Sequence, residues 1–217
     1  AEKNQIIDKA VTEVVAKQKE LGFHVITDGE FRRTYWHLDF MWGFEGVGHE
    51  QTGSGVQFDG ELASLEDTYL TGKVKAKPHP FVEYFKFLKQ FEDENCIARQ
   101  TMPAPAQLLA ELYREDNGKN TDTVYPDHEQ LIQDIAVAYR TVIQELYAAG
   151  CRNIQFDDCT WGMIVDDDFW KSMAGKGFTL EHEALQYLTV NNLAIEDKPE
   201  GLTINTHVCR GNYHSCY

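Results

Sequence analysis

Apolar residues recur every three or four positions in several stretches of the chain, a spacing that predicts amphipathic helices. One such stretch covers residues 6–21 and is followed by Gly22, a residue type that often ends a helix. Another covers 128–149, with its apolar side chains on one stripe, and is followed by Gly150. Further helices are predicted at 80–91 and 181–195.

Short runs rich in β-branched and aromatic residues lie between these helices and predict strands. The predicted strands are 23–27, 68–75, 97–102, 153–156 and 202–209. Strands that alternate with helices are typical of parallel βαβ units. The stretch 43–67 is rich in glycine and charge, and we expect it to be an irregular insertion over one face. Since no linker interrupts the pattern, residues 1–217 are predicted to form a single domain.

The ends of the predicted strands favour a (β/α)8 TIM barrel over a doubly wound sheet. Three strands end in ionisable residues, at 28–30, 157–158 and 207–209, as expected where βα loops converge on a barrel mouth. No glycine-rich first turn of the nucleotide-binding type is found. Five strands cannot close an eight-stranded barrel, so we expect these 217 residues to lack the first strand and the last two.

Composition narrows the class of protein further. The formal net charge of −15 would repel a phosphate backbone, so no nucleic-acid partner is expected. No apolar run reaches the roughly 18 residues of a membrane helix, and none forms a signal peptide, which predicts a cytoplasmic protein without a membrane partner. The five cysteines lack CxxC spacing and are predicted to be reduced thiols.

His207 and Cys209 are the sharpest chemical feature of the sequence. Residues i and i+2 of a strand point to the same face, so the imidazole and the thiol project together. Zinc binds nitrogen and sulfur, and this pair could supply two of its ligands. The alternative is a buried polar histidine beside an inert cysteine. A further alternative uses His214 and Cys216, which repeat the spacing and could complete a small structural metal site.

Glu30 and Asp157 follow two other predicted strands. Carboxylates at a barrel mouth suit recognition of an ammonium group or general acid–base catalysis. The alternative is that both are solvated loop acids in an acidic chain. Asp158 is predicted to face away from Asp157 and to be structural, because side chains alternate along a strand.

An aromatic segment at 35–42 follows Glu30. It could form a stacking wall for a planar ligand, but a satellite core that covers one end of the barrel is favoured. Arg32 and Arg33 could bind a carboxylate or a phosphate, or pair with the surplus acids.

Three segments together resemble the cobalamin-independent methionine synthase family, especially its short single-barrel members. They are VITDGEFRR at 25–33, QFDDCTWG at 155–162 and THVCRGN at 206–212. The order and spacing of these strand ends match from about residue 6 to the end of the chain.

The resemblance implies zinc-dependent transfer of a methyl group to the thiol of homocysteine or a similar thiol, forming methionine. It implies that His207 and Cys209 bind zinc and that Glu30 and Asp157 hold the amino-acid substrate. Methyltetrahydrofolate is the methyl donor that the family implies. The family's other zinc ligands and its acid–base histidine come from later strands, so no acid–base residue is assigned here. Two alternatives stay open: a non-catalytic zinc- or thiol-binding barrel, and a barrel hydrolase or lyase that uses the two carboxylates as acid and base.

Overall fold

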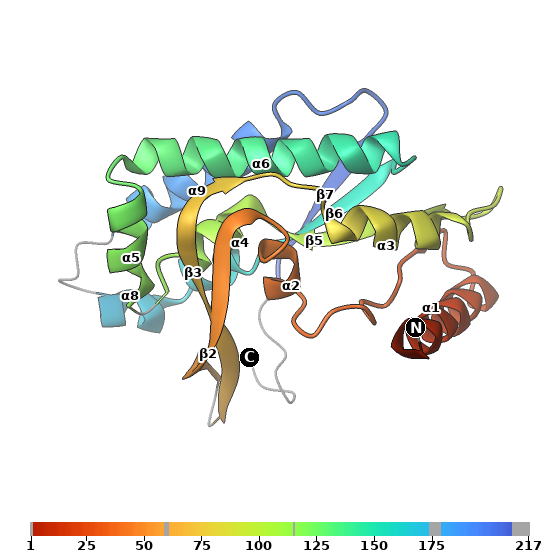
Figure 1. The fold of residues 1–217 in the computed structure, drawn as a ribbon, viewed down its shortest axis with the longest axis horizontal. Coiled ribbons are helices and arrows are strands. Elements are labelled where there is room, and N and C mark those ends of the chain that lie inside the picture. The colour runs from red at the N-terminus through yellow and green to blue at the C-terminus, as the bar shows by residue number, and fades with distance from the viewer. Residues whose placement is uncertain (1, 59–60, 115, 174–178, 210–217) are drawn as a thin grey trace.

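The computed structural model describes residues 2–58, 61–114, 116–173 and 179–209 and has a mixed α/β fold (Figure 1). Its parallel strands are β1 (Val25–Ile26), β4 (Ile97–Ala98), β5 (Gln100–Pro103), β6 (Asn153–Asp157) and β7 (Thr203–His207). β1 pairs with β4, and β6 pairs with both β5 and β7. One residue, Arg99, separates β4 from β5, and its N–H donates to the carbonyl of Ile26 at 2.9 Å. The parallel strands therefore lie side by side in chain order.

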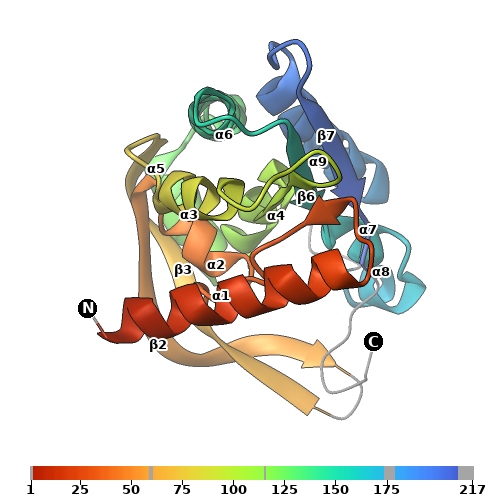
Figure 2. The same cartoon turned by 90° about the vertical axis from the view of Figure 1, so that its right-hand side faces the viewer.

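Helices fill the connections between these strands. They are α1 (Glu2–Glu20), α2 (Leu38–Met41), α3 (Pro80–Lys89), α4 (Pro105–Glu111), α5 (Asn117–Val124), α6 (His128–Ala148), α7 (Thr160–Ile164), α8 (Asp167–Met173) and α9 (Leu180–Ile195). The predicted helices at 6–21, 80–91, 128–149 and 181–195 are confirmed as α1, α3, α6 and α9. In Figure 2, α7 and α8 lie beyond the end to which β7 points.

The longest helix, α6, follows from its sequence. The Asp127 side chain caps the helix by accepting the N–H of Glu129 at 3.0 Å. Gly150 ends it with a φ of 96°, a backbone conformation that glycine adopts without strain. The predicted apolar stripe is buried along its whole length, from Leu131 to Leu146. This stripe packs α6 into the core, and α6 also contacts α4 and α9.

The region 43–75 differs from its prediction. β2 (Glu45–Phe58) and β3 (Glu61–Lys75) form an antiparallel pair, a long curved ribbon in Figure 1. The interpretation of 43–67 as irregular is therefore wrong, and 68–75 belongs to this pair rather than to the parallel strands. The glycines that indicated irregularity let the strands approach closely. A Cβ on Gly46 would lie 2.3 Å from the Lys73 carbonyl oxygen, and one on Gly48 would lie 2.7 Å from the Thr71 side chain.

The other four predicted strands are confirmed as parallel strands in small sheets, none of which closes within the described ranges. In the same part of the chain, no helix is long and apolar enough to span a membrane. One apolar cluster forms the core, and Met102, Ile154 and Phe156 contribute to it from β5 and β6. The neighbouring positions on these strands are polar, which gives the sheet one apolar and one polar face.

Candidate functional site

The polar face of the β5–β6–β7 sheet carries a connected set of side chains. Arg99 donates to the side-chain oxygens of Asn153 at 2.6 Å and Gln155 at 3.0 Å. The amide nitrogen of Gln155 donates to Oδ1 of Asp157 at 2.7 Å, and His207 contacts the same oxygen. These residues alternate along their strands, so the face leads toward the carboxyl ends of β6 and β7.

Asp157 and His207 are register partners at the ends of β6 and β7. His207 Nδ1 lies 2.8 Å from Asp157 Oδ1. An ionised carboxylate only accepts hydrogen bonds, so Nδ1 carries the proton and the lone pair of the neutral ring resides on Nε2. The Asp157 side chain is 12% exposed and that of His207 is 49% exposed. The imidazole is therefore anchored on its buried side and accessible on the other.

Two thiols lie beside this pair. Cys159 and Cys209 each follow the strand-end residue of β6 or β7 by two positions, and both are partly exposed. Their side chains are hydrogen bonded to each other. Burial, together with the neighbouring Cys209 thiol, raises the pKa of Cys159 to about 12.

Glu30 lies in the turn after β1, with a φ of 61° that is rare for a residue with a side chain. Its N–H donates to Oδ1 of Asp28 at 2.9 Å, which holds the turn. Its Oε1 accepts from Arg33 at 2.9 Å and from the Thr101 hydroxyl at 2.8 Å. The Arg33 guanidinium also donates to the Thr101 carbonyl at 2.6 Å and lies over the Phe81 ring. Glu30 is thus fixed against β5, with its side chain one-third exposed.

The predicted site residues fall into connected groups. Thr101 on β5 is the register partner of Gln155 on β6, so the Glu30 group and the Asp157 group lie on adjacent strands. Asp157 and His207 are brought together directly, and Cys209 follows His207 by two residues. Among the described residues, no group of three or more His, Cys, Asp and Glu side chains is placed to hold a metal ion. His214 and Cys216 lie outside the described residues.

For Arg32, Arg33 and the aromatic segment, the structure supports the interpretations that involve no ligand. Arg32 pairs with Asp8, and Arg33 pairs with Glu30, so both neutralise acids of the chain. Within the aromatic segment, Leu38, Phe40 and Met41 are buried in the core.

Asp158 has the predicted structural role. It is fully buried and accepts the backbone N–H of Thr160 at 3.2 Å and the Asn191 amide at 2.8 Å. Asn191 in turn accepts the backbone N–H of Ala106 at 2.9 Å. Asp158 therefore ties the end of β6 to α9 and α4, and fixes the segment that carries Asp157.

Sequence reasoning missed Arg33, Thr101, Gln155 and Cys159 as parts of the site. Gln155 and Cys159 each lie two residues from Asp157, so strand alternation could have indicated them. Thr101 and the Arg33 ion pair depend on contacts between distant segments and leave no local pattern.

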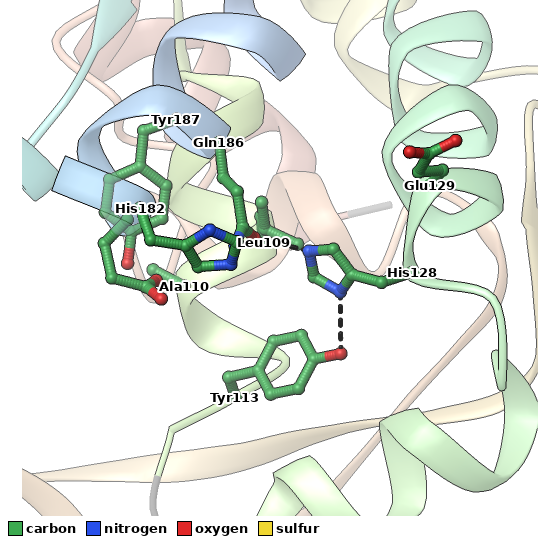
Figure 3. A pocket seen from close by; sticks show the side chains of 9 residues that line it. Leu109, Ala110, Tyr113, His128, Glu129, His182, Gln186 and Tyr187 are labelled. Carbon is green, nitrogen blue, oxygen red and sulfur yellow. Dashed lines mark hydrogen bonds between the residues drawn. The ribbon is translucent and has the colours of Figure 1, made fainter. Parts of the chain in front are cut away.

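A separate cavity of about 400 Å³ lies between α4, α6 and α9 (Figure 3). Four of its polar side chains bond to one another: Tyr113 to His128 at 3.0 Å, and Gln186 to both His128 and His182. Because these groups satisfy one another, they offer few unpaired donors or acceptors to a ligand. The strand-end group is therefore the better candidate for chemistry.

No family model matches the chain. Among proteins of known sequence, it is 35% identical to YxjH and 33% identical to YxjG, two uncharacterized proteins of Bacillus subtilis. The chain spans about half of these relatives, 54% and 55% of their lengths, while 98% of the chain is matched in each case. It is also 30% identical over 159 residues to a 5-methyltetrahydropteroyltriglutamate–homocysteine methyltransferase of Thermosynechococcus vestitus. That match covers 73% of the chain and 19% of the relative.

Comparison with solved structures leads to the same kind of protein. A Listeria monocytogenes protein, provisionally described as a vitamin-B12-independent methionine synthase, matches 97% of the chain and 56% of its own length. Its TM-score is 0.74 and its identity is 34%. A B12-independent methionine synthase from Shewanella sp. W3-18-1, in complex with selenomethionine, has a TM-score of 0.65 at 22% identity. It matches 94% of the chain and 52% of its own length, and at this identity shows similarity of fold. In sequence and fold, the chain resembles the short members of the cobalamin-independent methionine synthase family.

Proposed function

We propose that this chain is part of a zinc-dependent methyltransferase that transfers a methyl group to the thiol of homocysteine or a similar amino thiol, forming methionine. The observation that carries the proposal is the anchoring of His207 by Asp157 at 2.8 Å. Histidines that bind metals usually donate their second ring N–H to a carboxylate or a carbonyl, which fixes the tautomer and the ring orientation. Here Nδ1 is held in this way, and Nε2 is left with its lone pair.

The donor chemistry of the strand end fits zinc. Nε2 of His207 and Sγ of Cys209 would be two protein ligands, and a catalytic zinc site commonly has three. When bound, zinc would supply the Lewis acidity that keeps a substrate thiol in its nucleophilic thiolate form. Asp157 would hold the imidazole in position, and Gln155 would hold Asp157.

Glu30 and Asp157 would bind the ammonium group of the amino thiol. The structure offers the second oxygen of Glu30 for this contact, because Oε1 is already occupied by Arg33 and Thr101. The Arg33 charge reduces the attraction between Glu30 and a cation, so Asp157 would contribute more to ammonium binding. Holding the ammonium fixes the distance from the substrate sulfur to the metal ligands, which lowers the entropic cost of reaction.

The five parallel strands are adjacent in chain order and have helices in their longer connections, which supports the inference that they form part of the wall of a (β/α)8 barrel. The named activity of the Thermosynechococcus vestitus relative supports methyltetrahydrofolate as the methyl donor. A cytoplasmic location stays a prediction from the sequence.

The test is a methyl-transfer assay on the full-length protein with zinc, homocysteine and methyltetrahydrofolate, with methionine as the measured product. We expect Cys209→Ser to reduce turnover at least about 100-fold, since it removes a proposed metal ligand. Cys96→Ser is the matched control because its thiol is buried and bonds the Phe91 carbonyl, 3.7 Å away. Undiminished methyl transfer by Cys209→Ser would contradict the role of Cys209 as a metal ligand. A wild-type protein without methyl transfer would favour the hydrolase or lyase alternative, whose activity should survive loss of Cys209. Zinc and thiol binding without turnover, tested with several methyl donors, would favour a non-catalytic barrel.

A further inference from the structure

Cys159 and Cys209 are held next to each other by the backbone as well as by their thiols. Asp157 and His207 are register partners, and the Asp158 N–H donates to the His207 carbonyl at 2.9 Å as part of this pairing. Neighbouring strands lie about 4.8 Å apart, a spacing within the range of roughly 4.4–6.8 Å between the Cα atoms of a disulfide. Each cysteine follows one member of this register pair by two positions.

A second contact keeps Cys209 close to the turn that carries Cys159. A Cβ on Gly162 would lie 3.1 Å from the Cys209 carbonyl oxygen, so the backbone after β7 passes directly against α7. α7 begins at Thr160, immediately after Cys159. The thiols themselves share a hydrogen bond, and both residues are partly exposed and accessible to a small oxidant.

The other two described cysteines differ from Cys159 and Cys209 in their burial and in their hydrogen-bond partners. Cys96 and Cys151 are buried, and each thiol lies within hydrogen-bond distance of a backbone carbonyl, at 3.7 Å and 3.3 Å respectively. Burial raises the pKa of the Cys151 thiol to about 11. Because both side chains are buried, Cys96 and Cys151 should be protected from a small oxidant in solution.

Cys159 has two possible roles beside a zinc ligand: a further ligand, or a disulfide partner. A shared metal would require His207, Cys159 and Cys209 to point at a common centre, and the described residues contain no such group of three. The two thiols instead share a hydrogen bond. This arrangement favours bond formation between the sulfurs.

We propose that Cys159 and Cys209 form a reversible disulfide, a modification site that removes the Cys209 ligand from the metal site. With a peroxide as the oxidant, the Cys209 thiolate attacks a peroxide oxygen and becomes a sulfenic acid, and the O–O bond breaks with release of water or an alcohol. The Cys159 sulfur then attacks the Cys209 sulfur, the S–O bond breaks, and a second water leaves. The two sulfurs lose two electrons in total, and the peroxide gains them. A dithiol reductant reverses the bond through a mixed disulfide.

The link to zinc rests on the proposed function, whereas the disulfide itself does not. A Cys209 sulfur that is bonded to Cys159 is no longer a thiolate and cannot serve as a zinc ligand. Oxidation should therefore release zinc in proportion to disulfide formation. Reduction should restore the site.

The experiment treats the full-length reduced protein with a small excess of hydrogen peroxide, blocks remaining thiols by alkylation, and maps tryptic peptides by mass spectrometry. Trypsin places Cys159 in peptide 153–171 and Cys209 in peptide 177–210, because the Lys198–Pro199 bond resists cleavage. We expect these peptides to be joined, with a mass two hydrogens below their sum, and to separate on reduction. Cys96 and Cys151 should be alkylated in every sample and serve as internal controls.

Released zinc is measured in parallel with a chromogenic chelator. In Cys159→Ser, peroxide should give no joined peptides. Cys209 joined to the peptide that begins at residue 211, which carries Cys216, would overturn the proposal. So would alkylated Cys159 after Cys209 has been oxidised, or a tenfold loss of zinc affinity in Cys159→Ser, which would make Cys159 a ligand. If the protein binds no zinc, the proposed function fails, and the peptide map still decides whether the disulfide forms.

Discussion

His79 and His207 have opposite surroundings: the first is suited to stabilising the fold and the second to taking part in chemistry. His79 lies in the aromatic core and is 3% exposed. Its Nε2 donates to the Phe40 carbonyl at 3.0 Å, and its Nδ1 accepts the Phe81 N–H at 3.3 Å. His207 lies at the end of β7, and its Nδ1 lies 2.8 Å from Asp157 Oδ1.

The difference lies in which ring nitrogens remain available. Both nitrogens of His79 are used, and a proton on Nδ1 would face the Phe81 N–H, so the ring is fixed in its neutral form. Within the described part of the chain, Nε2 of His207 has no hydrogen bond, and the ring is half exposed. A saturated, buried imidazole stabilises the fold, whereas an anchored imidazole with an accessible lone pair can bind a ligand.

The largest expected effect is a loss of stability caused by a substitution next to His79. A Cβ on Gly43 would lie 2.1 Å from Nε2 of His79, whose ring is held at both nitrogens and cannot move aside. We expect Gly43→Ala to lower the free energy of unfolding by about 2–3 kcal/mol. The measurement is urea denaturation of the full-length protein. Gly72→Ala is the control, because a Cβ there meets no atom within 4 Å. Equal midpoints for the two variants would contradict the packing.

Acid should weaken the same region. Burial lowers the pKa of His79 from 6.5 to about 4. Between these values the unfolded state binds a proton that the folded state does not, so the free energy of unfolding falls as the pH is lowered from 6.5 to 4. At one pKa unit per 1.36 kcal/mol, the contribution is about 3 kcal/mol. Burial also lowers the pKa of His37, to about 3, which adds to the effect below pH 6.5.

The measurement is the difference between wild type and His79→Gln in urea denaturation at several pH values. Glutamine can donate and accept at similar positions but does not titrate. We expect the stability of wild type relative to the variant to fall as the pH is lowered through this window. A pH-independent difference would show that His79 does not stay neutral in the folded protein.

The Asp157→Asn variant tests the proposed roles of Asp157 in binding the substrate and in anchoring His207. A charge-assisted hydrogen bond contributes about 1.5–3 kcal/mol, so the dissociation constant of homocysteine should rise roughly 10- to 100-fold. Because Asp157 also anchors His207, zinc affinity should fall by about tenfold or more. Isothermal titration calorimetry measures both, with exposed Asp168→Asn as the control. If homocysteine binds Asp157→Asn as tightly as wild type, Asp157 does not hold the substrate.

The smallest expected effect concerns the support of Glu30. Thr101→Val keeps the shape of the side chain and removes the hydroxyl that bonds Glu30 and Arg33. We expect a loss of about 1 kcal/mol in unfolding free energy. Thr141→Val, on the exposed side of α6, should change stability by less than about 0.5 kcal/mol. Indistinguishable variants would mean that water replaces the hydroxyl without cost.

Regular burial made most of the fold predictable from the sequence. The apolar stripe of α6 has the period of a helix with one buried face, and the short runs of β6 and β7 are rich in strand-forming residues, so these elements were predicted. The alternation of β7 also indicated that His207 and Cys209 belong to one group. β2 and β3 were missed because the glycines there reflect close strand approach rather than a loop.

The finer parts of the site depend on contacts that no local pattern encodes. The positive φ of Glu30 and its contacts with Arg33 and Thr101 arise from the packing of the turn after β1 against β5. The Cys159–Cys209 contact required the register of β6 and β7, which sequence spacing alone does not give. The structure added the supporting contacts around residues that the sequence had already indicated.

Zinc affinity of the full-length protein tests the central claim most directly. Competition with a chromogenic chelator should give one tightly bound zinc per chain in wild type. His207→Gln and Cys209→Ser should each lower the affinity at least about tenfold, because each removes a proposed ligand. His79→Gln, the same substitution at the saturated histidine, should leave zinc affinity unchanged. Wild-type zinc affinity in both His207→Gln and Cys209→Ser would contradict the account.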